Sequence, residues 1–118
     1  MNLFIDDGYT RTATIEAVPG LHPGGKVEYR PALSLKRTEY SVVANSNQPA
    51  KINDYENDLI AKQVKCLDAA GHTGALAKAQ AALIEPTLRN RLLNLILGFE
   101  SGDEAGDEAS DVGNSPGV

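Results

Sequence analysis

The sequence predicts an α+β fold in which an N-terminal β-hairpin packs on a bundle of three to four helices. Two segments near the N-terminus alternate apolar and polar residues, as half-buried strands do. Further along, apolar residues recur at helical spacing. Strands and helices thus occupy separate parts of the chain, which favours α+β over an alternating α/β fold. The 118 residues and 42% hydrophobic content suit one domain, predicted over residues 1–99.

The predicted hairpin comes first. Thr10–Val18 and Lys26–Arg30 alternate with the period of a strand, and Pro19–Gly25 is a dense cluster of turn residues. A β-hairpin with a long loop is the simplest arrangement of these three segments. Leu3–Ile5 is predicted to add a short flanking strand, followed by a turn at Asp7–Gly8.

Two helices are predicted after Pro31, which cannot donate a hydrogen bond within a sheet. Ser34 is the predicted N-cap of a helix that continues to Ala44. The second helix begins at Pro49 or Ala50 and ends at Gly71. Asp58 and Lys62 form an i, i+4 ion pair on its polar side. Its apolar stripe consists of Ile52, Tyr55, Leu59, Ile60, Val64 and Leu67.

Two shorter helices complete the predicted domain. Gly74–Ile84 places Leu76, Ala79 and Leu83 on one face. Pro86 must end that helix, because a proline ring clashes with the preceding turn, and proline suits the first turn of the next helix. The fourth helix is therefore predicted over Pro86–Leu97, with Gly98 as its stop.

The fourth helix has a wider apolar face than a helix covered on one side needs. Such a face is either the centre of the domain's own core or a surface for a partner or a second copy of the chain. Both interpretations are open from the residues alone. The predicted protein-binding residues are Leu88, Leu92, Leu95 and Ile96.

Charge is concentrated at the C-terminus. The chain has 16 acids and 11 bases, for a net charge of −5. Residues 100–118 contain six of the acids, no base and few large apolar residues, so we expect a disordered acidic tail. This balance argues against coating a nucleic acid, although Lys36–Arg37, Arg89 and Arg91 provide small basic patches.

The apolar runs and the single cysteine bear on the compartment. No run reaches the roughly 18 apolar residues of a membrane span, and the acidic start does not fit a signal peptide. Cys66 has no second cysteine with which to form an internal disulfide. We therefore expect a soluble protein in a reducing compartment, without a membrane or nucleic-acid partner.

A phosphate-binding loop pattern occurs once. Gly20–Lys26 matches the first seven positions of G-x-x-x-x-G-K-[ST], but Val27 replaces the hydroxyl residue that holds magnesium. A strand rather than a helix is predicted next, so no helix N-terminus is available to stabilise a phosphate. We interpret the segment as a hairpin loop.

Catalytic and metal-binding patterns are weak throughout the sequence. His22 and His72 are predicted loop residues, and Cys66 is predicted to be a small hydrophobe on the second helix. Asp6–Asp7 is predicted to be exposed. The acids Asp54, Glu56 and Asp58 are predicted to lie on a solvated helix face, away from the desolvated setting that acid–base catalysis needs. The prediction is a protein without enzymatic activity or a cofactor.

Three segments follow one another in a particular order along the chain. They are Val27-Glu28-Tyr29-Arg30-Pro31-Ala32-Leu33, Val64-Lys65-Cys66-Leu67-Asp68 and Leu92-Leu93-Asn94-Leu95-Ile96-Leu97-Gly98. This order resembles the tail assembly chaperone type of small tailed-bacteriophage and prophage proteins, over Val27–Gly98. Cys66-Leu67-Asp68 stands where such proteins have a Trp-Asp pair.

The resemblance implies a non-enzymatic factor in the cytoplasm of a bacterial host cell. Such a factor shields the long apolar helices of a tape measure protein and recruits tail tube subunits. For Tyr29, Arg30 and Pro31 the resemblance implies a structural role. Two alternatives remain: a minor virion component, such as a head–tail connector or tube-associated protein, and a host protein-binding adaptor.

Overall fold

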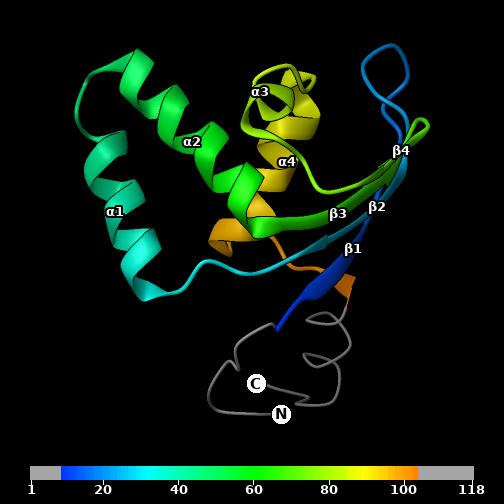
Figure 1. Cartoon of the computed structure of the whole chain (residues 1–118), viewed down its shortest axis with the longest axis horizontal. Coiled ribbons are helices and arrows are strands. Elements are labelled where there is room, and N and C mark those ends of the chain that lie inside the picture. The colour runs from blue at the N-terminus through cyan, green and yellow to red at the C-terminus, as the bar shows by residue number, and fades with distance from the viewer. Residues whose placement is uncertain (1–8, 104–118) are drawn as a thin grey trace.

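Strands and helices are mixed along residues 9–103, the range that the computed structural model describes (Figure 1). The strands make one sheet, and the helices lie to one side of it. In chain order the elements are β1 (Arg11–Ile15), β2 (Gly25–Tyr29), α1 (Ser34–Ala44), α2 (Pro49–Gln63), β3 (Val64–Ala69), β4 (His72–Gly74), α3 (Lys78–Ala81) and α4 (Pro86–Leu97).

The antiparallel sheet confirms the predicted α+β class and extends the predicted hairpin by two strands. The strand order is β1-β2-β3-β4. Ala13 of β1 is opposite Val27 of β2, which in turn is opposite Leu67 of β3. Because these three residues share one face of the sheet, their side chains are buried together.

The second predicted helix is too long. Helix α2 ends at Gln63, and the chain passes directly into β3, so Val64, Leu67 and Cys66 belong to a strand. The register of β3 against β2 shifts by one residue, which leaves Lys65 as the extra residue of a bulge. The bulge puts Val64 and Leu67 on the same face although they are three residues apart, which is the spacing of a helix.

The third predicted helix is also wrong over most of its length. Ala70 and Gly71 both have positive φ, at 52° and 82°, and they form the tight turn between β3 and β4. Gly71 is therefore a hairpin residue and not a helix stop. Helix α3 covers four residues, and Leu83 is 85% exposed instead of sharing a buried face with Leu76.

The other two helices have the predicted bounds. Helix α4 is preceded by Glu85 as its cap and followed by Gly98 in the left-handed conformation, with φ of 85°. Helix α1 begins at Ser34, but its N-cap is Leu33, so the prediction of a serine cap is wrong. The Asp58–Lys62 ion pair is confirmed at 3.0 Å.

One hydrophobic core joins the inner face of the sheet to α2 and α4. The outer face of the sheet is exposed and polar. Two backbone hydrogen bonds fix the segment between β2 and α1: Arg30 N–H donates to the Gln63 carbonyl at 2.7 Å, and Ala32 N–H donates to the Ile96 carbonyl at 2.9 Å. The start of α1 is therefore held against the end of α4.

The chain after α4 turns back along β1. Gly102 is buried where a Cβ atom would lie 2.7 Å from the Thr12 carbonyl oxygen. The Asp103 carboxylate accepts hydrogen bonds from the backbone N–H and hydroxyl of Thr14, at 3.3 and 3.0 Å. Ordered contacts therefore continue to Asp103, into the predicted tail. The rest of that tail lies outside the described residues, as do the predicted strand Leu3–Ile5 and the acids and turn over residues 6–8.

No helix in the described range combines the length and apolar character required to cross a membrane.

Candidate protein-binding groove

Helix α4 carries the four residues predicted to bind a partner. The Glu85 carboxylate accepts the backbone N–H groups of Thr87 and Leu88, at 3.0 and 3.1 Å, and so satisfies two free donors at the helix start. These bonds, that from Thr87 first, hold the pKa of Glu85 below its ordinary value. The cap at Glu85 thereby stabilises the N-terminal end of α4, just before its apolar face begins.

The structure places the predicted binding residues inside the domain. Their side chains belong to the core that α4 forms with the sheet and α2. The relative exposures are 7% for Leu88, 1% for Leu92, 2% for Leu95 and 0% for Ile96. Of the four, Leu95 also lines a surface cavity. In this conformation the four side chains are therefore buried in the core.

Helix α1 is mostly exposed, with Lys36, Tyr40 and Val43 half-buried on one face. None of its residues is buried, and it lies at the outer side of the molecule beside α2 (Figure 1). The Tyr40 hydroxyl donates to Glu56 of α2 at 2.9 Å, and the Tyr55 hydroxyl of α2 donates to Glu39 at 3.0 Å. The two tyrosine rings also make contact, with centroids 6.3 Å apart. Reciprocal tyrosine–glutamate bonds therefore hold α1 in place.

The same contacts change the acidity of both tyrosines. Burial, followed by the hydrogen bond to Glu56, raises the pKa of Tyr40 to about 12. Burial and the hydrogen bond to Glu39 likewise raise the pKa of Tyr55 to about 12. In each case the neutral phenol is favoured because ionisation would put a second negative charge beside a carboxylate.

A groove separates α1 from the end of α4. It consists of two cavities, of about 520 and 250 Å³, with Arg37 in the wall of both. We call this feature the α1–α4 groove. The larger cavity is lined by Arg11, Tyr29, Pro31, Ala32, Leu33, Ser34, Arg37, Thr38, Leu95, Gly98, Glu100 and Ser101. The smaller cavity is lined by Arg37, Tyr40, Ser41, Ala44, Asn45, Leu97 and Phe99.

The smaller cavity has mostly apolar walls. Ala44 and Tyr40 line it from α1, and Leu97 and Phe99 line it from the end of α4. Phe99, one of the two phenylalanines in the chain, is 73% exposed. A large apolar side chain at the mouth of an apolar cavity is a common feature of protein-binding surfaces.

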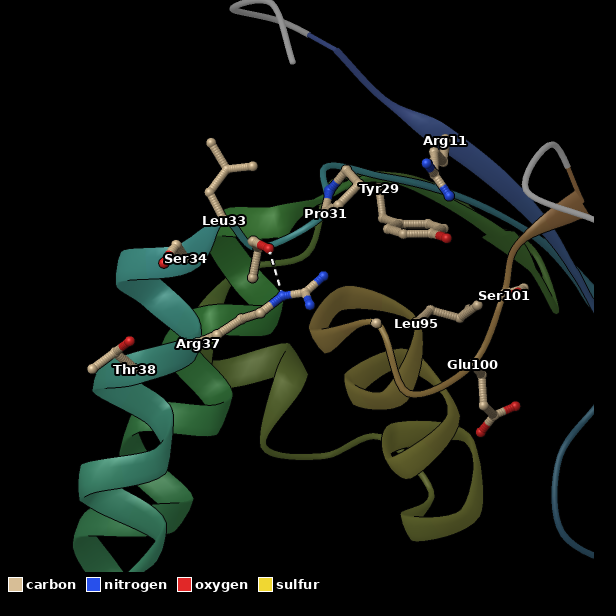
Figure 2. A pocket seen from close by; sticks show the side chains of 12 residues that line it. Arg11, Tyr29, Pro31, Leu33, Ser34, Arg37, Thr38, Leu95, Glu100 and Ser101 are labelled. Carbon is tan, nitrogen blue, oxygen red and sulfur yellow. Dashed lines mark hydrogen bonds between the residues drawn. The ribbon is translucent and has the colours of Figure 1, made fainter. Parts of the chain in front are cut away.

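Arg37 projects from α1 across the groove. Figure 2 shows its guanidinium group between α1 and the chain segment that follows α4. Its Nε donates to the Ala32 carbonyl at 3.0 Å. Across the groove, a Cβ atom built on Gly98 would come within 2.5 Å of an Arg37 terminal nitrogen, so the glycine permits this close approach.

A second charged cluster lies between α2 and α4. Arg89 forms an ion pair with Glu56 at 3.0 Å, and their side chains are 17% and 14% exposed. Arg89 also donates to the side chains of Asn53 and Asn57. The sequence predicts that Glu56 lies on a solvated helix face, and for this residue the prediction is wrong. This cluster ties three helices together, because Glu56 also accepts from Tyr40 of α1.

The remaining sequence candidates lie apart from the groove. In the glycine-rich segment, residues 20–24 lie in the hairpin loop, which has a bridge between Val18 and His22, and Gly25 and Lys26 already belong to strand β2. His22 lies in this loop, whereas His72 is in β4 and not in a loop. Cys66 is a half-buried strand residue. Over residues 9–103, no three metal-ligating side chains gather into a cluster.

Sequence reasoning missed the groove residues Tyr40, Ala44 and Phe99. Val43 and Ala44 follow Tyr40 by three and four residues, so these apolar residues of α1 share one face of the helix. Phe99 follows the helix stop Gly98 and precedes the acidic tail, a position with no obvious core partner. These two signals identify residues of the groove, but they do not predict that α1 lies beside the end of α4.

Comparisons of the chain with protein-family models, curated proteins and solved structures gave no match.

Proposed function

We propose that the protein is a non-enzymatic protein-binding factor whose α1–α4 groove accepts a helix of a partner. The observation that carries this proposal is helix α1, which has no buried residue yet forms one wall of a partly apolar groove. Tyr40 anchors α1 to the core and to α2, and this position leaves Arg37 and Ala44 to line the groove.

The length of α1 sets the length of the partner helix that could lie beside it. The 11 residues of α1 extend for about 16 Å, or three turns, at 1.5 Å per residue. Amphipathic helices that bind in grooves place their apolar side chains at intervals of three, four and seven residues, over a comparable length. A partner helix of three to four turns would therefore contact both cavities.

The resemblance to phage tail assembly chaperones leads us to propose the tape measure protein as the client. Long apolar helices are the kind of ligand that a helix-binding groove would shield. Tail tube subunits would be the second partner, and the site of action would be the cytoplasm of the bacterial host.

Co-purification from phage-producing cells tests this function. Tagged full-length protein should recover a long helical protein together with tube subunits, and it should be absent from purified particles. Ala44→Glu should abolish recovery, because it places a charge in the smaller cavity. Val42→Glu is the matched control, since Val42 is on the same exposed helix and outside both cavities.

Two outcomes would overturn the proposed function. If the protein is found inside finished particles, it is a virion component and not a chaperone. If Ala44→Glu and Val42→Glu both remain folded and recover the same partners as the wild type, the groove does not bind them. Circular dichroism of both variants establishes that they fold.

A further inference from the structure

We infer that the α1–α4 groove selects helices that carry an aspartate or glutamate between two apolar residues, with Arg37 as the specificity-determining residue. The inference rests on the proposed binding function and adds the chemistry of the partner. It is drawn from three features of the groove: the fixed position of the Arg37 guanidinium, the charges around it and the cavities on either side.

Arg37 is held in place by its Nε alone. This atom donates to the Ala32 carbonyl, and Ala32 N–H donates to the Ile96 carbonyl of α4. The guanidinium position is therefore linked through the backbone to both walls of the groove. Within residues 9–103, the two terminal nitrogens of Arg37 make no hydrogen bond or ion pair. Their planar geometry suits a carboxylate, which can accept two parallel hydrogen bonds.

The nearby carboxylates have other partners. Glu100 lines the larger cavity, but it pairs with Arg91 and accepts a hydrogen bond from Asn94 at 2.7 Å. Glu39 of α1 accepts from Tyr55 on the opposite side of the helix. In the described part of the chain, the groove thus has a basic centre, which favours an acidic ligand.

The two cavities specify where the apolar residues of the ligand lie. Arg37 belongs to the walls of both, so it separates them along the axis of α1. At about 250 Å³, the smaller cavity is below the range of roughly 300–1,000 Å³ for drug-sized ligands, and it suits one large side chain. The ligand would therefore have an apolar residue about one helical turn on each side of its carboxylate.

A displayed library of 16-residue helical peptides, randomised on one face, is the probe for this inference. It would be selected in parallel on full-length wild-type protein and on Arg37→Gln. Peptides enriched on the wild type should carry Asp or Glu flanked by apolar residues three or four positions away. Replacing that acid by its amide in a synthetic peptide should weaken binding to the wild type about tenfold, as expected for a charge-assisted pair.

Controls separate the charge of Arg37 from its neighbours. Lys36→Gln removes the same charge from the next residue, which lines neither cavity, and should leave peptide affinity within about twofold of the wild-type value. On Arg37→Gln, the acidic peptide and its amide form should bind equally. The comparison of the two peptides on wild-type protein does not depend on the folding of any variant.

The outcomes distinguish this inference from the proposed function. If selected peptides lose binding on Ala44→Glu but carry no preferred acid, the groove binds helices and the role of Arg37 is refuted. If no selected peptide is sensitive to Ala44→Glu, the groove function itself fails. A wild-type dimer that Ala44→Glu dissociates, seen by sedimentation velocity, would place a second copy of the chain in the groove and also refute the inference.

Discussion

Replacing Arg89 with methionine should destabilise the fold by about 3 kcal/mol. Arg89 pairs with Glu56 and donates to Asn57, which is 6% exposed. The substitution leaves Glu56 Oε1 and the side-chain oxygen of Asn57 without the Arg89 donor. Glu56 Oε2 still accepts from Tyr40. Removing one partner of a fully buried pair costs roughly 3–5 kcal/mol, and we take the lower end because both side chains keep some contact with solvent.

Urea unfolding followed by circular dichroism measures this change. For a slope of about 1.5 kcal/mol per molar urea, a loss of about 3 kcal/mol lowers the midpoint by about 2 M. Arg91→Met, two residues along the same helix, is the control. Arg91 pairs with Glu100 at the surface, with side-chain exposures of 31% and 38%, so its loss should cost about 1 kcal/mol or less.

The double variant Arg89→Met with Glu56→Met tests the physical reason. If the cost comes from an unpaired charge, removing Glu56 as well should recover part of the stability, because an apolar pair of similar volume carries no desolvation penalty. The reasoning would be refuted by an Arg89→Met variant within about 0.5 kcal/mol of the wild type. It would also be refuted by a double variant whose loss equals the sum of the two single losses.

Three further predictions follow from the structure. Since folding raises the pKa of Tyr40 and Tyr55 to about 12, their contribution to stability is complete below about pH 10 and lost as the pH rises through 12; a midpoint near 10 in the tyrosinate absorbance that is lost on Tyr40→Phe or Tyr55→Phe would contradict this. Glu85→Ala should lower the melting temperature at neutral pH but less in acid, because the lowered pKa means that the cap's contribution disappears as the pH falls below about 4.5; equal losses at both pH values would refute it. Gly102→Val should destabilise the domain by about 1–3 kcal/mol in thermal unfolding, since its Cβ would overlap the sheet, and an unchanged melting temperature would count against that packing.

The elements that sequence reasoning located are those with local chemical signals at both ends. Pro86 and Gly98 bound α4, and both act through their own backbone geometry. The β1–β2 hairpin has alternating strands around a loop rich in glycine and proline. Each signal is readable within a few residues, so the prediction did not depend on knowing what packs against the segment.

The boundary between α2 and β3 could not be read in this way. Val64 and Leu67 have helical spacing, and they extend the apolar stripe of α2 without interruption. Their strand conformation is imposed by pairing with β2, and the bulge at Lys65 provides the three-residue spacing. A tertiary contact about 40 residues away in sequence therefore overrode the local pattern.

The candidate site depends even more on contacts between distant segments. A leucine-rich helix was the obvious candidate for binding, but leucine is most useful where the domain buries it, and α4 is the central core helix. The groove instead uses apolar residues that the core leaves out, such as Phe99. Its other wall is positioned by tyrosine–glutamate bonds between α1 and α2.

Leu95 of α4 belongs both to the core and to the wall of the α1–α4 groove. This residue is buried in the core, and it also lines the larger cavity beside Arg37. The burial of α4 makes the groove wall rigid, and a rigid wall reduces the entropy that a ligand must lose on binding. Helix α1 has no fully buried residue, so its backbone hydrogen bonds are closer to solvent than those of α4. We therefore expect partner binding to reduce amide exchange in α1 and to leave α4 unchanged, and equal protection of both helices would argue against this division.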